Sequence, residues 1–141
     1  MSSRNKQPVL ISACLLGENC RWHGRKVYPS SFVRKYLATH PEVEVIPVCP
    51  EELGGLPTPR PPVKRRRGRV FETCADKAKR PQVTGKDVTA AFVAGAEATL
   101  AIAQKQGCRF AILCQWSPSC DLNGITGRLL SQNGIRIKNT F

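Results

Sequence analysis

The stretch DVTAAFVAGAEATLAIAQKQGCRFAILC, residues 87–114, places a long helix directly before a buried strand. Apolar side chains recur with a period near 3.6 residues, which predicts a helix over about residues 88–106. Asp87 is expected to cap its first turn and Gly107 to end it. The apolar run that follows predicts a strand over residues 108–114. A helix that leads into a buried strand is typical of α/β proteins.

The other predicted elements also alternate in type along the chain. Strands are expected over residues 8–14, 43–48, 69–74 and 135–137, and short helices after Ser30 and over residues 125–132. This alternation predicts an α/β fold with a mostly parallel sheet flanked by helices. The length of 141 residues, with no internal repeat, fits a single domain over residues 1–141.

Three cysteines lie just past predicted strands: Cys14, Cys49 and Cys120. The carboxyl ends of parallel strands form the edge where open α/β sheets bind ligands, so the site is expected there. Three thiolates at this edge can hold a metal or an iron–sulfur cluster and leave one coordination position free. The residues alone also allow zinc or plain buried cysteines. Cys114 is a rival for the third ligand, and Cys20 is a candidate thiol beside the ligands.

The cysteine content also bears on the cellular compartment. The seven cysteines form no CxxC pair, and no signal-peptide pattern precedes them. Free thiols persist in a reducing compartment, so we expect a cytoplasmic protein. No apolar run approaches the ~20 residues that cross a bilayer, and no membrane contact is expected.

Residues 51–86 form a basic segment rich in proline and glycine, which is expected to be a long loop. The net charge of the chain is +12, and residues 60–86 hold ten Lys and Arg against two acidic residues. The segment is either a solvated loop or an electrostatic site for phosphates or RNA. An RNA-binding metalloprotein without turnover, acting through residues 60–86, is therefore one alternative function. A sulfur carrier or redox sensor that uses the thiols is another.

Four motifs follow one another along the chain. They are SACLLG at 12–17, CRWHG at 20–24, CPEELGGLPTPRPP at 49–62 and SPSC at 117–120. In this order they resemble the DUF523 family, whose characterised members are the thiouracil desulfurases. The resemblance spans residues 9–137.

The resemblance implies a cofactor, a reaction and a set of site residues. By motif, a [4Fe-4S] cluster would be held by Cys14, Cys49 and Cys120, and its fourth iron would capture the sulfur of a thiolated pyrimidine. The family's catalytic carboxylate and hydroxyl would correspond to Glu51 and Ser117. The substrate would be 2- or 4-thiouracil, or its nucleoside or nucleotide, and the products uracil and sulfide. The reaction would be a hydrolysis without net electron transfer.

Three further residues are expected to contact the substrate: Ser12, Ser119 and Lys86. Lys86 is a candidate contact for a phosphate. Both candidate catalytic residues, Glu51 and Ser117, also have structural interpretations. Glu51 can be a salt-bridge partner of Arg60, and Ser117 can cap a turn before a proline.

The chain departs from the family pattern at three places. Trp22 and His23 stand where the family usually has Tyr and Asp, and Asp121 replaces a usual glycine after SPSC. Lys64 and the arginines that follow it replace a usual acid after PRPP. These changes leave the proposed ligands intact and alter the pocket walls. We expect the added positive charge to favour a thiolated nucleotide or RNA over a free base.

Overall fold

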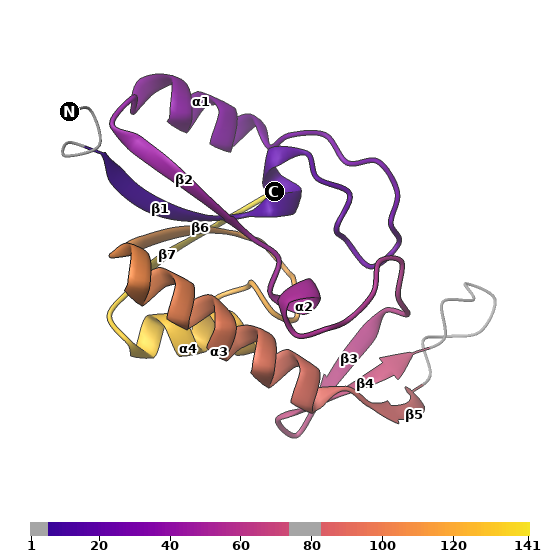
Figure 1. Ribbon diagram of the computed structural model, residues 1–141. Coiled ribbons are helices and arrows are strands. Elements are labelled where there is room, and N and C mark those ends of the chain that lie inside the picture. The colour runs from indigo at the N-terminus through magenta and orange to yellow at the C-terminus, as the bar shows by residue number, and fades with distance from the viewer. Residues whose placement is uncertain (1–5, 74–82) are drawn as a thin grey trace.

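Four parallel strands form the central sheet of the computed structural model, which describes residues 6–73 and 83–141 (Figure 1). They are β1 (Gln7–Ser12), β2 (Val43–Val48), β6 (Phe110–Cys114) and β7 (Arg136–Thr140), in the order β2-β1-β6-β7. β1 is central, because it pairs with β2 along its whole length and with β6 at Leu10 and Ile11. The predicted α/β fold with a parallel sheet is confirmed.

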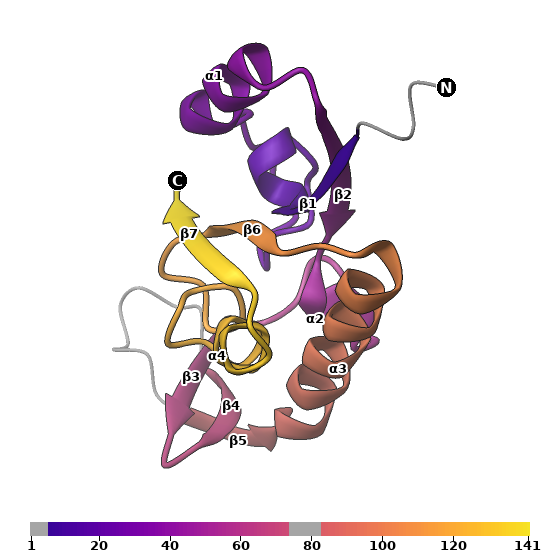
Figure 2. The ribbon, with the colours of Figure 1, turned by 90° about the vertical axis from the view of Figure 1, so that its left-hand side faces the viewer.

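Helices cover both faces of this sheet. α1 (Ser31–Thr39) lies over one face, and α3 (Thr89–Gln106) and α4 (Ile125–Gln132) lie over the other (Figure 2). Parallel strands need long crossovers, and these helices supply them. Within the described residues, no helix has both the length and the apolar character that crossing a membrane requires.

Alternate side chains of β1 build a core on each side of the sheet, since successive residues of a strand point to opposite faces. Val9 and Ile11 belong to the same buried cluster as Val33 of α1. Leu10 belongs to a second cluster with Leu130 of α4. Both faces of β1 are therefore buried, which explains why its sequence contains an unbroken apolar run.

The predicted helix ends differ slightly from those observed. The cap position of α3 is Val88, one residue beyond the expected Asp87. The Asp87 carboxylate still serves the first turn, because its Oδ1 accepts a hydrogen bond from the Thr89 N–H at 2.8 Å. Gly107, in the left-handed conformation at φ 74°, ends the helix as expected. Ser30 caps α1 by accepting from the Val33 N–H at 3.3 Å.

Three strand boundaries also need correction. The strand expected over residues 8–14 ends at Ser12 and turns into the 3-10 helix η2 (Ala13–Leu16), so Cys14 lies on a helical turn. The strand expected over 108–114 begins at Phe110, and the one expected over 135–137 runs from Arg136 to Thr140. Apolar runs locate buried strands, whereas the hydrogen-bonded ladder that fixes their ends depends on partner strands elsewhere in the chain.

The strand predicted over residues 69–74 is confirmed over Arg69–Thr73, but the loop expected over the rest of residues 51–86 is wrong for the part that the structure describes. The segment contains α2 (Pro50–Leu53) and three antiparallel strands in the order β3-β4-β5, namely β3 (Val63–Arg66), β4 (Arg69–Thr73) and β5 (Val83–Asp87). Val70 anchors this second sheet in a buried cluster with Phe92 of α3. Cys74, expected at the end of a strand and outside the ligand set, lies outside the described residues.

Candidate active site

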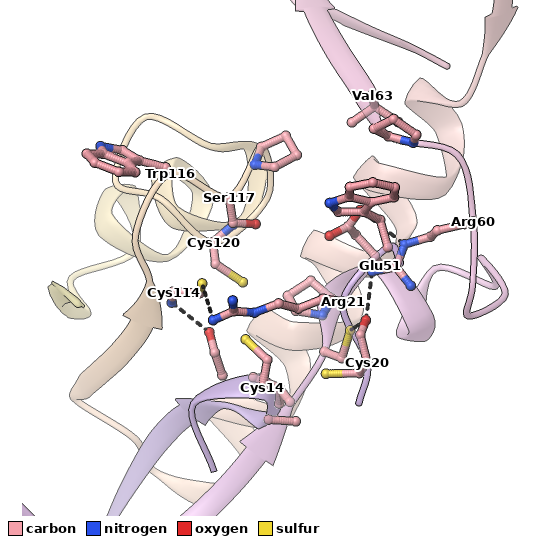
Figure 3. Close-up of a pocket in the computed structure, with 18 of the residues that line it drawn as sticks. Cys14, Cys20, Arg21, Glu51, Arg60, Val63, Cys114, Trp116, Ser117 and Cys120 are labelled. Atoms are coloured by element: carbon pink, nitrogen blue, oxygen red, sulfur yellow. Dashed lines mark hydrogen bonds and ion pairs between the residues drawn. The ribbon is translucent and has the colours of Figure 1, made fainter. Parts of the chain in front are cut away.

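The candidate site lies at the carboxyl ends of β1, β2 and β6. The chain runs from β1 to β2 on one side of the sheet centre and from β6 to β7 on the other. A reversal of this kind opens a crevice beyond the strand ends. A pocket of about 290 Å³ lies at this position, with walls from the segments after the three strands and from the start of β3 (Figure 3).

Of the cysteines that the structure describes, five line the pocket: Cys14, Cys20, Cys49, Cys114 and Cys120. They reach it from different parts of the fold. Cys14 sits in η2 just after β1, Cys49 follows β2, and Cys114 ends β6. The structure therefore brings the three predicted ligands to one pocket, together with the rival Cys114 and the accessory thiol of Cys20.

Arg21 places a positive charge among these sulfurs. Its guanidinium extends between Cys14, Cys114 and Cys120 (Figure 3), and its Nη2 donates to Cys114 Sγ at 3.7 Å. Its Nε is buried and has no hydrogen-bond partner within the described residues. An unsatisfied buried donor costs about 1–3 kcal/mol, so an anionic group in the pocket would relieve this cost.

Two of the thiols are shifted toward the thiolate. Hydrogen bonds from Cys114 and Cys20, aided by Arg21, lower the pKa of Cys14 to about 2. A hydrogen bond from Cys20 lowers the pKa of Cys49. The thiolate is the form of cysteine that binds metals, so both residues have the ionisation that a ligand requires.

The remaining thiols of the pocket are shifted toward the neutral form. Hydrogen bonding to Cys14 raises the pKa of Cys20 and of Cys114, because each donates its proton to that thiolate. Burial raises the pKa of Cys120 to about 12, and a hydrogen bond from Ser12 opposes this effect. Cys20 and Cys114 thus act in the structure as donors to a neighbouring thiolate.

Ser12 is almost completely buried at the end of β1, with 2% of its surface exposed. Its Oγ accepts a hydrogen bond from the Cys114 N–H at 2.9 Å, while its hydroxyl also contacts the Cys120 thiol. Ser12 lines the pocket, as expected of a substrate contact. Its hydrogen bonds show that it also holds two cysteines in place.

Glu51 is held by a buried arginine. Arg60 Nε lies 3.3 Å from Glu51 Oε1, and the side chain of Arg60 is 4% exposed. Arg60 Nη2 also donates to the carbonyl oxygen of Cys20 at 2.9 Å. Glu51 is therefore a salt-bridge partner of Arg60, and it lines the pocket at the same time.

Ser117 lies on the opposite wall of the pocket. Its Oγ accepts hydrogen bonds from the N–H groups of Ser119 at 3.2 Å and Cys120 at 3.0 Å. These bonds shape the turn that presents Cys120. Because the oxygen accepts from two backbone groups, the hydroxyl hydrogen of Ser117 is left to donate elsewhere.

The structure does not bring Ser119 and Lys86 to the pocket. Ser119 is 1% exposed, and its hydroxyl shares a 2.7 Å hydrogen bond with Thr126 Oγ1 of α4. Its role is to anchor the SPSC turn on α4. Lys86 is an exposed residue of β5 in the second sheet. Neither side chain is among the residues that line the pocket.

Helix α2 is positioned by direct backbone contact with α3. A Cβ atom at Gly95 would overlap the carbonyl oxygen of Pro50, and one at Gly54 would overlap that of Ala91. Both glycines are needed for this approach. The contact places the first turn of α2, and with it Glu51, over the pocket.

The residues that depart from the family pattern surround this site. Trp22 lines the pocket and is 41% exposed. His23 Nδ1 accepts from the Arg25 N–H at 2.9 Å, which stabilises the adjacent turn. Asp121 accepts through Oδ2 from the Trp116 N–H at 2.8 Å and through Oδ1 from the Asn123 N–H at 3.1 Å. Lys64 lies on β3 at the edge of the site.

Sequence reasoning missed two residues of the site. Arg21 was not singled out, although its place directly after Cys20 in the CRWHG motif was a usable signal. Trp116 was also missed, and its place directly before the SPSC motif was the usable signal.

The sequence model of the 2-thiouracil desulfurase family matches residues 9–139. The chain belongs to the 2-thiouracil desulfurase family. The resemblance seen in the four sequence motifs is thereby confirmed. This desulfurase-family chain is also similar to the uncharacterized protein YbbK of Bacillus subtilis (strain 168), with 33% identity over 144 residues that cover 92% of this chain and 93% of YbbK.

A solved structure adds a comparison for this member of the 2-thiouracil desulfurase family. The [4Fe-4S]-dependent thiouracil desulfidase TudS matches its fold with a TM-score of 0.77 and 34% sequence identity. The match covers 95% of this chain and 91% of TudS. The cysteines of the pocket are consistent with the cofactor that the name of TudS states.

Proposed function

We propose that the protein is an iron–sulfur-dependent desulfurase that converts a thiolated pyrimidine to the corresponding uracil in the cytoplasm. The observation that carries the proposal is the meeting of Cys14, Cys49 and Cys120 with Glu51 and Ser117 in one pocket. The family match and the similarity to TudS support the same reaction class. Candidate substrates are 2- and 4-thiouracil and their nucleosides or nucleotides.

The donor set of the pocket fits a [4Fe-4S] cluster bound by Cys14, Cys49 and Cys120. Thiolates are the usual ligands of such clusters, and the unpartnered Nε of Arg21 favours an anionic group beside them. Within residues 6–73 and 83–141, no three His, Cys, Asp or Glu side chains converge on a single ion. A [4Fe-4S] cluster does not need three side chains to meet at one ion, because each cysteine would bind a separate iron. When bound, it would supply an open iron with Lewis acidity and affinity for sulfur.

We assign Glu51 to proton transfer. Among the described residues that line the pocket, it supplies the one carboxylate, and the Arg60 ion pair fixes its orientation. In this role Glu51 takes the two protons of the attacking water one after the other, the first as the oxygen bonds to the thiocarbonyl carbon and the second as the C=O bond forms, and passes both to the departing sulfur. The carbon gains the water oxygen, the C–S bond breaks, and the sulfur leaves as hydrogen sulfide. The reaction balances without an oxidant or reductant.

We assign Ser117 to orientation of the pyrimidine. Two backbone N–H groups fix its oxygen, so its hydroxyl hydrogen points to a defined direction and can donate to a ring acceptor of the substrate. Apolar wall residues such as Val48 and Val63 line the same pocket and limit the access of bulk water. The chain thus supplies a proton carrier on one wall and a hydrogen-bond donor on the other.

The proposal is tested by anaerobic purification followed by iron and labile-sulfide analysis and a thiouracil assay. We expect about four irons and four sulfides per chain and release of sulfide from 2- or 4-thiouracil. Cys108→Ala is a matched control, because Cys108 is buried in a core cluster and does not line the pocket. A colourless zinc protein without turnover, or a metal-free protein that only responds to oxidant, would contradict the proposal.

A further inference from the structure

A second pocket, of about 450 Å³, adjoins the candidate active site. The two pockets share wall residues: Val63, Trp116, Ser117 and Pro118. The outer pocket adds Lys64 and Arg65 of β3, together with Asp121 and Asn123. Ser117 therefore stands at the junction between the thiol-lined pocket and a basic outer pocket.

The basic wall of the outer pocket continues along the β3–β4 hairpin, residues 63–73, here called the basic hairpin. In this hairpin Lys64 pairs with Phe71 and Arg66 with Arg69. Because alternate residues of a strand share a face, Lys64, Arg66 and Arg69 lie on the same side of it. The opposite side carries Val70, which is fully buried. One face of the hairpin thus binds the core, and the other presents cations to solvent.

Most of these cations have no carboxylate partner among the residues that the structure describes. Arg69 is paired with Asp87 at 2.5 Å. No carboxylate of the described residues lies within ion-pair distance of Lys64, Arg66 or Arg67. Arg66 directly faces Arg69, and like charges at such positions destabilise a sheet. A row of unneutralised cations fits a ligand that carries several negative charges.

Trp116 provides an exposed aromatic surface beside this row. Its side chain is 75% exposed, and its ring points away from the cavity (Figure 3). Its backbone adopts φ 62°, a conformation that bulky residues rarely take. The hydrogen bond from its N–H to Asp121 holds this conformation, and Phe141 packs against the ring with centroids 4.8 Å apart. The same hydrogen bond occupies one oxygen of the Asp121 carboxylate in the outer pocket.

We propose that the substrate base is part of an RNA strand. This inference rests on the desulfurase function proposed above and specifies its substrate class. The thiolated pyrimidine is turned out of its stack into the thiol-lined pocket, as other enzymes that act on single bases require. A neighbouring base stacks on Trp116, and successive phosphates contact Lys64, Arg66 and Arg67 of the basic hairpin. Aromatic stacking combined with a basic groove is the common way to bind single-stranded nucleic acid.

The number of cations favours a strand over a lone nucleotide. Lys64 and Arg66 are two residues apart on one strand, which separates their Cα atoms by about 7 Å. A single phosphate carries at most two negative charges, fewer than the three positive charges of Lys64, Arg66 and Arg67. A strand offers several phosphates and uses both cations as well as Arg67 at the turn.

The test compares three substrates: a short RNA with one 4-thiouridine, 4-thiouridine 5′-monophosphate and free 4-thiouracil. Sulfide release is measured with the cluster-loaded protein and with the variant Lys64→Gln/Arg66→Gln/Arg67→Asn. Asparagine is chosen at residue 67 because it tolerates the positive φ of 51°. The matched control, Arg34→Gln/Lys35→Gln/Lys105→Gln, removes three exposed charges from α1 and α3.

We expect the hairpin variant to lose roughly 10- to 100-fold in kcat/KM on the RNA and nothing on free 4-thiouracil. The slope of log affinity for RNA against log salt should fall by about 2, as expected for three lost phosphate contacts. Trp116→Asn, which keeps the backbone conformation, should weaken RNA binding by roughly 5- to 100-fold. The control variant should match the wild type in each measurement.

The outcomes separate this inference from the proposed function. Turnover of free 4-thiouracil with no preference for RNA, or with no effect of the hairpin variant on RNA, overturns the inference and leaves the desulfurase function standing. Absence of turnover on all three substrates by cluster-loaded protein overturns the proposed function. Tight RNA binding without sulfide release overturns both and identifies an RNA-binding metalloprotein.

Discussion

Gly95 of α3 lies directly against the carbonyl oxygen of Pro50, the first residue of α2. Glu51 is the next residue along the chain, and Cys49 is the one before. The position of a candidate catalytic carboxylate and of a candidate ligand therefore depends on a glycine in a helix that contributes no side chain to the pocket.

A methyl group at Gly95 should push α2 away from α3. We expect Gly95→Ala to cost about 1–3 kcal/mol of unfolding free energy and to lower iron content and activity together, because overpacking moves the backbone. Denaturant unfolding and iron analysis check this. Val93→Ala is a control, since Val93 is 40% exposed on the same helix. Full activity and stability in Gly95→Ala would show that the close approach does not position the site.

The proton-transfer role of Glu51 predicts a defect in chemistry with little effect on the fold. Glu51→Gln should lower kcat by about 10²- to 10⁴-fold while iron content stays at the wild-type level. The glutamine oxygen can still accept from Arg60, so the shape of the pocket is kept. Glu52→Gln is the neighbouring control, because Glu52 does not line the pocket. Equal activity of the Glu51→Gln variant and the wild type would remove Glu51 from the mechanism.

Loss of the Ser12 hydroxyl is expected to weaken retention of the cofactor. Ser12→Ala leaves the Cys114 N–H without its hydrogen-bond partner and removes the contact to the Cys120 thiol. We expect a loss of about 1–3 kcal/mol in unfolding free energy and a lower iron content. Ser12→Thr keeps the hydroxyl and should restore part of both. A variant Ser12→Ala with unchanged stability and iron content would be evidence against this role.

The choice between Cys120 and Cys114 as third ligand is open to a direct measurement. Cys14→Ala, Cys49→Ala and Cys120→Ala should each abolish cluster binding, whereas Cys114→Ala should retain it. The iron and sulfide content of each variant is measured after anaerobic purification. If Cys114→Ala empties the site and Cys120→Ala does not, the proposed ligand set is wrong.

Acid titration probes the attachment of the basic hairpin. Hydrogen bonds from Thr89, followed by Arg69, lower the pKa of Asp87 from 3.8 to about 2. A lowered carboxylate pKa stabilises the fold above the unfolded value, and this contribution is lost as the pH falls from about 4 to about 2. Asp87→Asn should therefore show a shallower loss of unfolding free energy over that range. Identical pH profiles of variant and wild type would contradict this assignment.

The parallel sheet could be predicted from sequence because apolar runs and a 3.6-residue period report burial, which is a local property of the chain. The three ligand candidates could be placed together for the same reason, since each follows such a run. The strand predicted over residues 69–74 matches β4, whereas β3 was missed because three of its four residues are charged and hide the strand pattern. Ser119 was misjudged because its bond to Thr126 depends on the docking of α4, which no local pattern reveals.

The candidate ligands Cys14, Cys49 and Cys120 come from segments that are far apart in the chain. During synthesis the last of them leaves the ribosome long after the first two have emerged. Since the proposed ligand set needs all three, the cofactor can be inserted only after the SPSC turn has been translated and has docked on α4. A cell would then contain a finite pool of newly made, metal-free protein, whose size depends on the rate of iron–sulfur delivery rather than on the rate of synthesis alone.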